Sequence, residues 1–120
     1  MGMMLFPKTP AKKKRKSHKD SILHRKDGTC YLCMKLHGDD SYHDTLQEHH
    51  IFGDSDRDHS EAEGLKVYLC LNHHTYGKEA VHQNAEIRKG VWADGQRAFE
   101  QEHTREEFMR IFGKNYIMEE

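Results

Sequence analysis

The chain has 120 residues, enough for one domain with a tail, and its 35% hydrophobic content is nearly matched by 32% charged residues. So few apolar side chains build only a thin core, and small domains with thin cores usually depend on disulfides or a metal. The three cysteines are an odd number for a disulfide framework. No apolar stretch is long enough for a secretory signal or a transmembrane helix. These features predict a soluble, cytoplasmic protein whose thiols are free to bind metal.

The charge is distributed unevenly along the chain. Residues 1–26 carry nine Lys or Arg and one acid, whereas residues 27–120 carry ten Lys or Arg and nineteen acids. Within residues 1–19, clustered positive charge, two prolines and few apolar side chains predict a disordered basic arm, which leaves 20–120 as the folded domain. The basic run of the arm consists of Lys12, Lys13, Lys14, Arg15 and Lys16.

This basic run is compatible with three roles. A solvated tail, an arm that lies along nucleic-acid phosphates and a nuclear-localisation signal all share its composition. The sequence does not separate them. If the arm binds DNA, removing residues 1–19 is expected to weaken binding and flatten its salt dependence, while the metal content stays intact.

The first part of the folded region predicts a turn followed by a short strand. The stretch DGTCYLCMKL contains a glycine turn that presents Cys30 and Cys33. Residues 45–52 (TLQEHHIF) alternate loosely between polar and apolar side chains, which favours a strand. The stretch GDSDRDHS that follows is rich in turn-forming residues and is predicted to be a polar loop.

A second strand is predicted at 65–70, because LKVYLC is rich in β-branched and aromatic residues. Just before it, Ser60 and Glu63 have the spacing of a capping box, which predicts one helical turn ended by Gly64. After the strand, the stretch NHHTYG is expected to form a helix or a turn.

The last third of the chain is predicted to be helical. Residues 81–103 have a mostly helical pattern that Gly90 and Gly95 weaken. Thr104 is predicted to open another helix, which Gly113 ends. The large apolar side chains of these helices are interpreted as core residues: Trp92, Phe99, Phe108 and Phe112. Together with the two strands, these helices indicate an α+β fold.

Two pairs of metal-binding residue types have two-residue spacers, Cys30-x-x-Cys33 and Cys70-x-x-His73. Each spacing lets a tight turn direct two side chains at one ion, and two such pairs complete the tetrahedron of a structural zinc site. Structural zinc contributes about 10–16 kcal/mol in finger peptides, which would offset the thin core. Two alternatives are three buried cysteines acting as small apolar side chains, and a redox pair of Cys30 and Cys33.

The histidines include two adjacent pairs, His49–His50 and His73–His74. Adjacent strand residues point to opposite faces of a sheet, so the first pair is expected to do two different jobs. Neutral imidazole binds divalent metals, and its ordinary pKa of about 6.5 suits a general base. In phosphodiester cleavage a base activates water while a metal stabilises charge on the phosphate. Other histidines lie in polar stretches and are interpreted as surface residues: His37, His43, His59 and His103.

The order of these motifs resembles the HNH nucleases, which have a ββα-metal, treble-clef-like fold. The resemblance covers about residues 30–82: Cys-x-x-Cys, then an acid followed by His-His-Ile, then Leu-Cys-x-x-His-His. The run HHIFG…SE..GLKVYLC is specific in combination. It looks closest to a phage-type subgroup that includes recombination-associated nucleases. That likeness implies a phage or prophage protein in a bacterial host, DNA as the substrate and a recombination protein as a candidate partner.

The resemblance also implies a role for each paired histidine. His49 matches a ligand of the catalytic metal, and His50 matches the general base. In the closing motif His73 takes the place of a second zinc cysteine, and His74 falls on another ligand of the catalytic metal. His82, in a later Val-His pair, matches a third ligand. The implied cofactors are a structural Zn²⁺ and a catalytic Mg²⁺ or another divalent ion.

One residue of the family pattern is missing. The middle Asn, which normally helps to orient the base, is expected shortly before the second-strand cysteine, where this chain has EGLKV. Asn84 or the backbone are the candidates to replace it. Arg57, in the loop after the first strand, is a candidate phosphate contact, with a solvated arginine as the alternative.

The sequence therefore predicts a zinc-stabilised HNH-type domain with C-terminal helices that hydrolyses DNA. The alternative is a non-catalytic zinc module that binds nucleic acid or protein. Such a module would keep the zinc ligands without needing His49, His50 and His74 together. Nicking of supercoiled DNA by the wild type, and not by His50→Ala, would separate the two.

Overall fold

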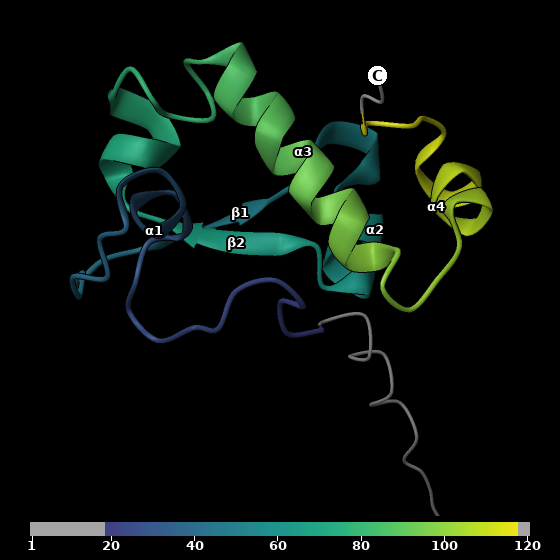
Figure 1. The fold of residues 1–120 in the computed structure, drawn as a ribbon, viewed down its shortest axis with the longest axis horizontal. Helices are drawn as coiled ribbons and strands as arrows, with labels where there is room; N and C mark the ends of the chain where they lie inside the picture. The colour runs from purple at the N-terminus through teal and green to yellow at the C-terminus, as the bar shows by residue number, and fades with distance from the viewer. Residues whose placement is uncertain (1–18, 118–120) are drawn as a thin grey trace, which may run out of the picture.

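The computed structural model describes residues 19–117, so the basic run at 12–16 lies outside the described residues. The described part forms a small α+β domain with a two-stranded antiparallel sheet and four α-helices (Figure 1). This confirms the predicted fold class at that level. Within residues 19–117, no helix is both long enough and apolar enough to cross a membrane.

The sheet pairs β1 (Gln47–His50) with β2 (Lys66–Leu69), and His50 lies directly opposite Lys66. Residues directly opposite each other share a face of an antiparallel sheet. His50 therefore shares a face with Lys66, whereas His49, one place back, belongs to the other face. The register confirms that the two adjacent histidines face opposite sides of the sheet, as expected.

Both strands are shorter than predicted. The Ile51 N–H still donates to the Leu65 carbonyl at 3.0 Å. Gly64 then takes a left-handed conformation with φ 74°, which turns the chain away and ends the pairing. Ile51 and Phe52 leave the ladder and enter the core, each only 2% exposed. Burial of these two side chains replaces the strand pairing that the alternating pattern predicted.

The two helices of the first half were not fully predicted. The turn at Cys30 leads directly into α1 (Tyr31–His37), and Cys30 caps that helix by accepting from the Cys33 N–H at 3.4 Å. The polar loop predicted after β1 was wrong, and the helical turn predicted before Gly64 is longer than expected, because α2 (Arg57–Glu63) follows a short 3₁₀ turn.

Ser60 is not the cap of a helix, as its spacing from Glu63 had suggested. It lies inside α2 and is fully buried. Its hydroxyl donates to the Phe52 carbonyl at 2.8 Å and accepts from the Phe52 N–H at 3.0 Å. These two bonds tie α2 to the end of β1, since they satisfy backbone groups that have left the sheet. Gly64 ends α2 as predicted.

The C-terminal helices largely match the prediction. Helix α3 (Ala85–Phe99) is shorter at both ends than the predicted range 81–103, and α4 (Arg105–Phe112) begins at the Thr104 capping box and ends at Gly113. Figure 1 shows α3 crossing the face of the sheet, with α4 beyond its C-terminal end. After α4 the chain returns, and Ile117 is 9% exposed.

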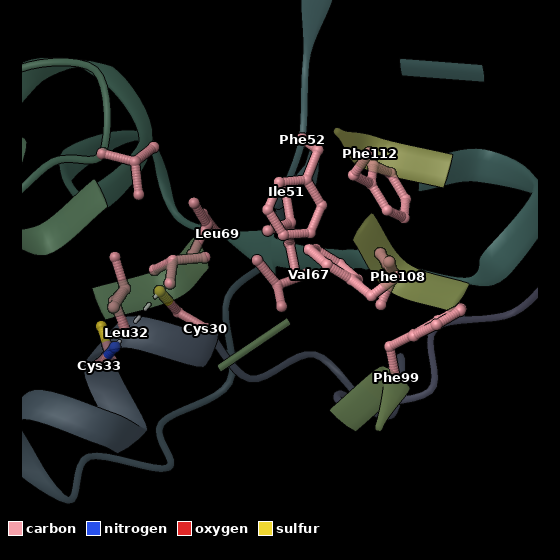
Figure 2. Packing of buried hydrophobic residues seen from close by; sticks show 13 residues of the cluster. Cys30, Leu32, Cys33, Ile51, Phe52, Val67, Leu69, Phe99, Phe108 and Phe112 are labelled. Carbon is pink, nitrogen blue, oxygen red and sulfur yellow. Dashed lines mark hydrogen bonds between the residues drawn. The ribbon is translucent and has the colours of Figure 1, made fainter. Parts of the chain in front are cut away.

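The core lies between the sheet, α3 and α4. Figure 2 shows phenylalanine side chains gathered over Val67 at one end of this cluster, with Cys30 and Cys33 at the other. Three of the four predicted core aromatics are buried, and the fourth, Trp92, is only half-buried. Helix α3 approaches β1 closely at Gly95, where an added Cβ would lie 3.0 Å from Ile51 Cγ2. A glycine at this point lets the helix pack against the end of the strand.

Candidate active site

The predicted zinc ligands come together where the start of α1 meets the end of β2. The His73 Nδ1 lies 3.7 Å from Cys30 Sγ, 3.4 Å from Cys33 Sγ and 3.5 Å from Cys70 Sγ. The Cys33 and Cys70 sulfurs are 4.0 Å apart. Zinc bonds of about 2.3 Å to sulfur and about 2.0 Å to nitrogen place tetrahedral donors about 3.5–3.8 Å apart. The group can therefore hold a metal such as zinc.

Local backbone geometry aims these side chains inward. After Cys70 the chain forms the short π-helical turn η4 (Asn72–Tyr76). The Cys70 carbonyl accepts from the N–H groups of both His73 and His74. Burial, and next the neighbouring Cys30, raise the pKa of the Cys33 thiol. A thiolate at this position therefore needs a cation beside it, which a bound metal would supply.

Glu79 lies just outside the cluster, and the sequence did not single it out. Its carboxylate lies 3.7 Å from His73 Nε2 and 2.8 Å from His37 Nε2. A carboxylate on the far nitrogen of a metal-binding imidazole is a common outer-shell arrangement. His37 is exposed as predicted, whereas His43 is half-buried, with Nε2 3.8 Å from Cys33 Sγ.

A second group of imidazoles lies beside the first. It joins His49 from β1, His74 from η4 and His82 from the turn before α3, with ligand atoms all within 4.8 Å of one another. The Nε2 atoms of His74 and His82 are 3.2 Å apart. Two nitrogens bound to one tetrahedral ion at about 2.0–2.1 Å would be separated by about 3.3 Å. The spacing, which also suits a hydrogen bond between the rings, is therefore compatible with two ligands to a shared ion.

Hydrogen bonding and burial both favour the metal-binding form of these rings. His74 Nδ1 lies 2.6 Å from Gln47 Oε1. An amide oxygen only accepts, so the proton lies on Nδ1 and the Nε2 lone pair faces the cluster. Burial, and then His74 and His82, lower the pKa of His49 to about 3. Burial, and then His82, also lower the pKa of His74. Gln47 was missed, although strand alternation places it on the same face as His49.

The donor set bears on the choice of ion. Three imidazole nitrogens suit zinc, nickel, copper or iron, whereas Mg²⁺ prefers oxygen ligands. The group formed by His49, His74 and His82 therefore fits a transition-metal ion better than Mg²⁺, the first catalytic ion that the family resemblance implied.

His50 has a carboxylate partner on the other side of the strand. Its Nε2 lies 2.6 Å from Glu61 Oε1, and its side chain is 10% exposed. The Lys66 ammonium lies 3.2 Å from the other Glu61 oxygen and 3.0 Å from Glu48. Burial alone lowers the pKa of Lys66, but its hydrogen bonds to both carboxylates raise the net pKa above the ordinary value. An ionised Glu61 can only accept, so in the neutral His50 ring the proton lies on Nε2 and Nδ1 is left as an acceptor.

Of the two candidates for the missing family Asn, the Asn84 side chain is engaged elsewhere. Its Oδ1 caps α3 by accepting from the Glu86 and Ile87 N–H groups, and its Nδ2 donates to the Lys78 carbonyl at 3.0 Å. The residue in contact with His50 is Glu61 from α2. Lys66 was the sequence feature that could have pointed to a carboxylate such as Glu61, because a lysine in a buried strand requires carboxylate partners.

An open cleft of about 550 Å³ is lined both by the three-imidazole group and by His50. Its lining includes four consecutive residues at 48–51, the last three of β1 and the residue after it, and also His74 and His82. Because neighbouring strand residues face opposite ways, a cleft can touch four in a row only by running along the strand edge. Arg57 also lines the cleft. Arg88 and Trp92 line it too, and neither was singled out from the sequence.

Comparisons of the chain with protein-family models, with curated proteins and with solved structures find no match. The HNH resemblance of the motifs stays a prediction. The chemistry open to this protein is therefore inferred from the two metal-ligand groups and the cleft.

Proposed function

We propose that the protein is a metal-dependent DNA endonuclease of the HNH type, built on a ββα-metal domain with a structural zinc. The observation that carries the proposal is the meeting of a three-imidazole group with a carboxylate-paired histidine, His50, in one cleft. A non-catalytic zinc module needs only the cysteine-rich group. Hydrolysis, in contrast, uses a second ligand group to hold a metal ion and a positioned base to activate water.

In this proposal the two ligand groups serve different ions. The cysteines with His73 hold the structural zinc, while His49, His74 and His82 hold a catalytic transition ion. When bound, that ion stabilises negative charge on the phosphate and on the leaving oxygen. The residues around the cleft then have to bind the strand and place a water molecule.

His50 is the proposed general base. Its Nδ1 takes a proton from the attacking water, while Nε2–H donates to Glu61. The Glu61 carboxylate fixes the ring orientation and stabilises the imidazolium that forms, as a carboxylate does behind a catalytic histidine in other hydrolases. Lys66 in turn holds Glu61 in place. Arg57 and Arg88, which line the same cleft, are the proposed phosphate contacts.

Nicking of supercoiled DNA tests the proposal, with Mg²⁺, Mn²⁺, Ni²⁺ and Zn²⁺ each added in turn. His50→Ala is expected to lower the cleavage rate by about 10²–10⁴-fold, the usual contribution of a general base. His59→Ala is the matched control, because His59 is exposed and does not line the cleft. Both variants should keep the zinc content of the wild type. No cleavage with any of these ions would favour the non-catalytic module, and equal rates for wild type and His50→Ala would remove His50 as the base.

The role of Glu61 has its own test. Glu61→Ala removes the acceptor for His50, whereas Glu61→Gln keeps an amide oxygen that can accept the same hydrogen bond. We expect kcat to fall in both variants, more strongly for Ala, with little change in KM. Nitrogen NMR of the His50 ring should show the Nε2–H tautomer in the wild type and a mixture in Glu61→Ala. An unchanged tautomer in Glu61→Ala would exclude the positioning role.

A further inference from the structure

A second hollow adjoins the histidine cleft. It has a volume of about 480 Å³ and lies between α3 and residues 114–116. Lys89, Trp92 and Arg97 line it from α3. Trp92 lines both hollows. The two hollows are therefore neighbours that share one lining side chain.

The lining of the two hollows is positive on an otherwise negative body. Residues 19–117 contain thirteen Lys or Arg and eighteen Asp or Glu. The lining of the two hollows contains five of these cations: Arg57, Arg88, Lys89, Arg97 and Lys114. It contains three carboxylates: Glu48, Asp54 and Glu86. Cations are thus concentrated beside the site, which favours an anionic ligand.

Aromatic rings support two of these cations. The Arg88 guanidinium lies 5.9 Å from the centre of the Trp92 ring, and the Lys114 ammonium lies 5.6 Å from that of Tyr116. Arg88 also donates to the Val81 carbonyl at 2.9 Å. These contacts hold the positive groups beside the hollows.

We propose that Lys89, Arg97 and Lys114, here called the α3 cation band, bind the phosphate backbone of the DNA strand as it leaves the histidine cleft. The identity of the anion as DNA rests on the proposed function. Lys89 and Arg97 are separated by about 12 Å along the helix axis, which is the rise of three to four nucleotides of one B-DNA strand. The band extends the footprint beyond the cations of the cleft itself.

Trp92 is the only tryptophan of the chain, so tryptophan fluorescence observes this surface directly. In His50→Ala protein, in which cleavage is expected to be slow, a short DNA duplex is expected to change Trp92 emission on binding. The same titration at several salt concentrations gives the slope of log K against log salt, which falls in magnitude by about one for each phosphate contact removed. A labelled duplex followed by anisotropy gives an independent binding curve.

Variants of the band make the test quantitative. Adding Lys89→Gln and Lys114→Gln together to the His50→Ala protein should lower the magnitude of the slope of log K against log salt by about two. Arg110→Gln is the matched control, since Arg110 is exposed and lines neither hollow. An unchanged slope in the double variant would overturn the proposal, as would Trp92 emission that stays constant while anisotropy shows binding. Tighter binding of a matched RNA duplex would overturn the assignment to DNA. Failure of the wild type to cleave DNA would count against the proposed activity and leave a reduced slope standing as evidence for the band.

Discussion

His73 and His74 are neighbours in one turn, yet they belong to two groups with opposite surroundings. His73 is 4% exposed, and its Nδ1 faces three cysteine sulfurs. His74 is half-buried and faces His82, which is exposed at the cleft. Structural zinc sites fill every coordination position with protein, whereas catalytic sites keep one open. The first group is closed in this sense, and the second opens to the solvent.

This difference predicts where a substitution does its damage. The closed group joins α1 to the end of β2, so losing a ligand there removes a cross-link of the fold. The open group lies along the edge of β1, so losing a ligand there removes an ion and little packing. The two neighbouring groups should therefore respond independently to substitution.

The largest effect is expected for Cys70→Ser. Structural zinc supplies about 10–16 kcal/mol in finger peptides, and a thin core leaves little else to hold the fold. We expect the variant to lose its tightly bound zinc and its cooperative thermal transition. Elemental analysis and calorimetry of the purified chain measure both. Retention of zinc and of the wild-type transition would show that the cysteine group is not a structural metal site.

His74→Ala is expected to affect the other group alone. The change removes one imidazole from the open site and should abolish binding of the second ion, while the cysteine-bound zinc stays. Without added metal, the free energy of unfolding should change by about 1 kcal/mol or less, because His74 is half-buried. Metal titration followed by calorimetry measures both quantities. Loss of both ions together would mean that the two groups are one coupled site, and His82→Ala serves as the companion variant.

The fold could be predicted where local patterns agree with tertiary packing. Thr104 and Gly113 bound α4 as expected, because a capping box and a left-handed glycine act within one turn. Helix α2 was missed because its sequence is polar and its support is tertiary. The buried Ser60 hydroxyl holds it against the Phe52 backbone. The spacing of Ser60 and Glu63 alone had predicted that Ser60 is a helix cap.

The candidate site was predicted better for ligands than for their supports. Cysteine spacing places ligands on one turn, so the cysteine group and the histidine pairs were visible in the sequence. Gln47, Glu61 and Glu79 were not, because an outer partner is defined by contacts between elements far apart in the chain. The family pattern led to Asn84, which caps a helix instead.

A smaller effect is expected for Gln47→Leu. The leucine keeps the volume but removes the acceptor of the His74 Nδ1–H, so the ring no longer favours the tautomer that faces the ion. Removing such outer partners typically costs 10–100-fold in metal affinity. We expect that loss at the open group, and no change at the cysteine group. Competition titration with a colorimetric chelator resolves the two affinities, and an equal loss at both sites would contradict their independence.

The smallest effects distinguish two glycines of α3. Nothing lies within 4 Å of an added Cβ at Gly90, so Gly90→Ala should raise the free energy of unfolding by about 0.5–1 kcal/mol. At Gly95 the same methyl would press on buried Ile51, the residue after His50, and overpacking of about 1–3 kcal/mol should outweigh the gain in helix propensity. Displacing Ile51 should also weaken ion binding at the open group while zinc stays bound. Urea unfolding of both variants, with the chelator titration, measures this, and an equal gain in stability would show that α3 does not press on the cleft.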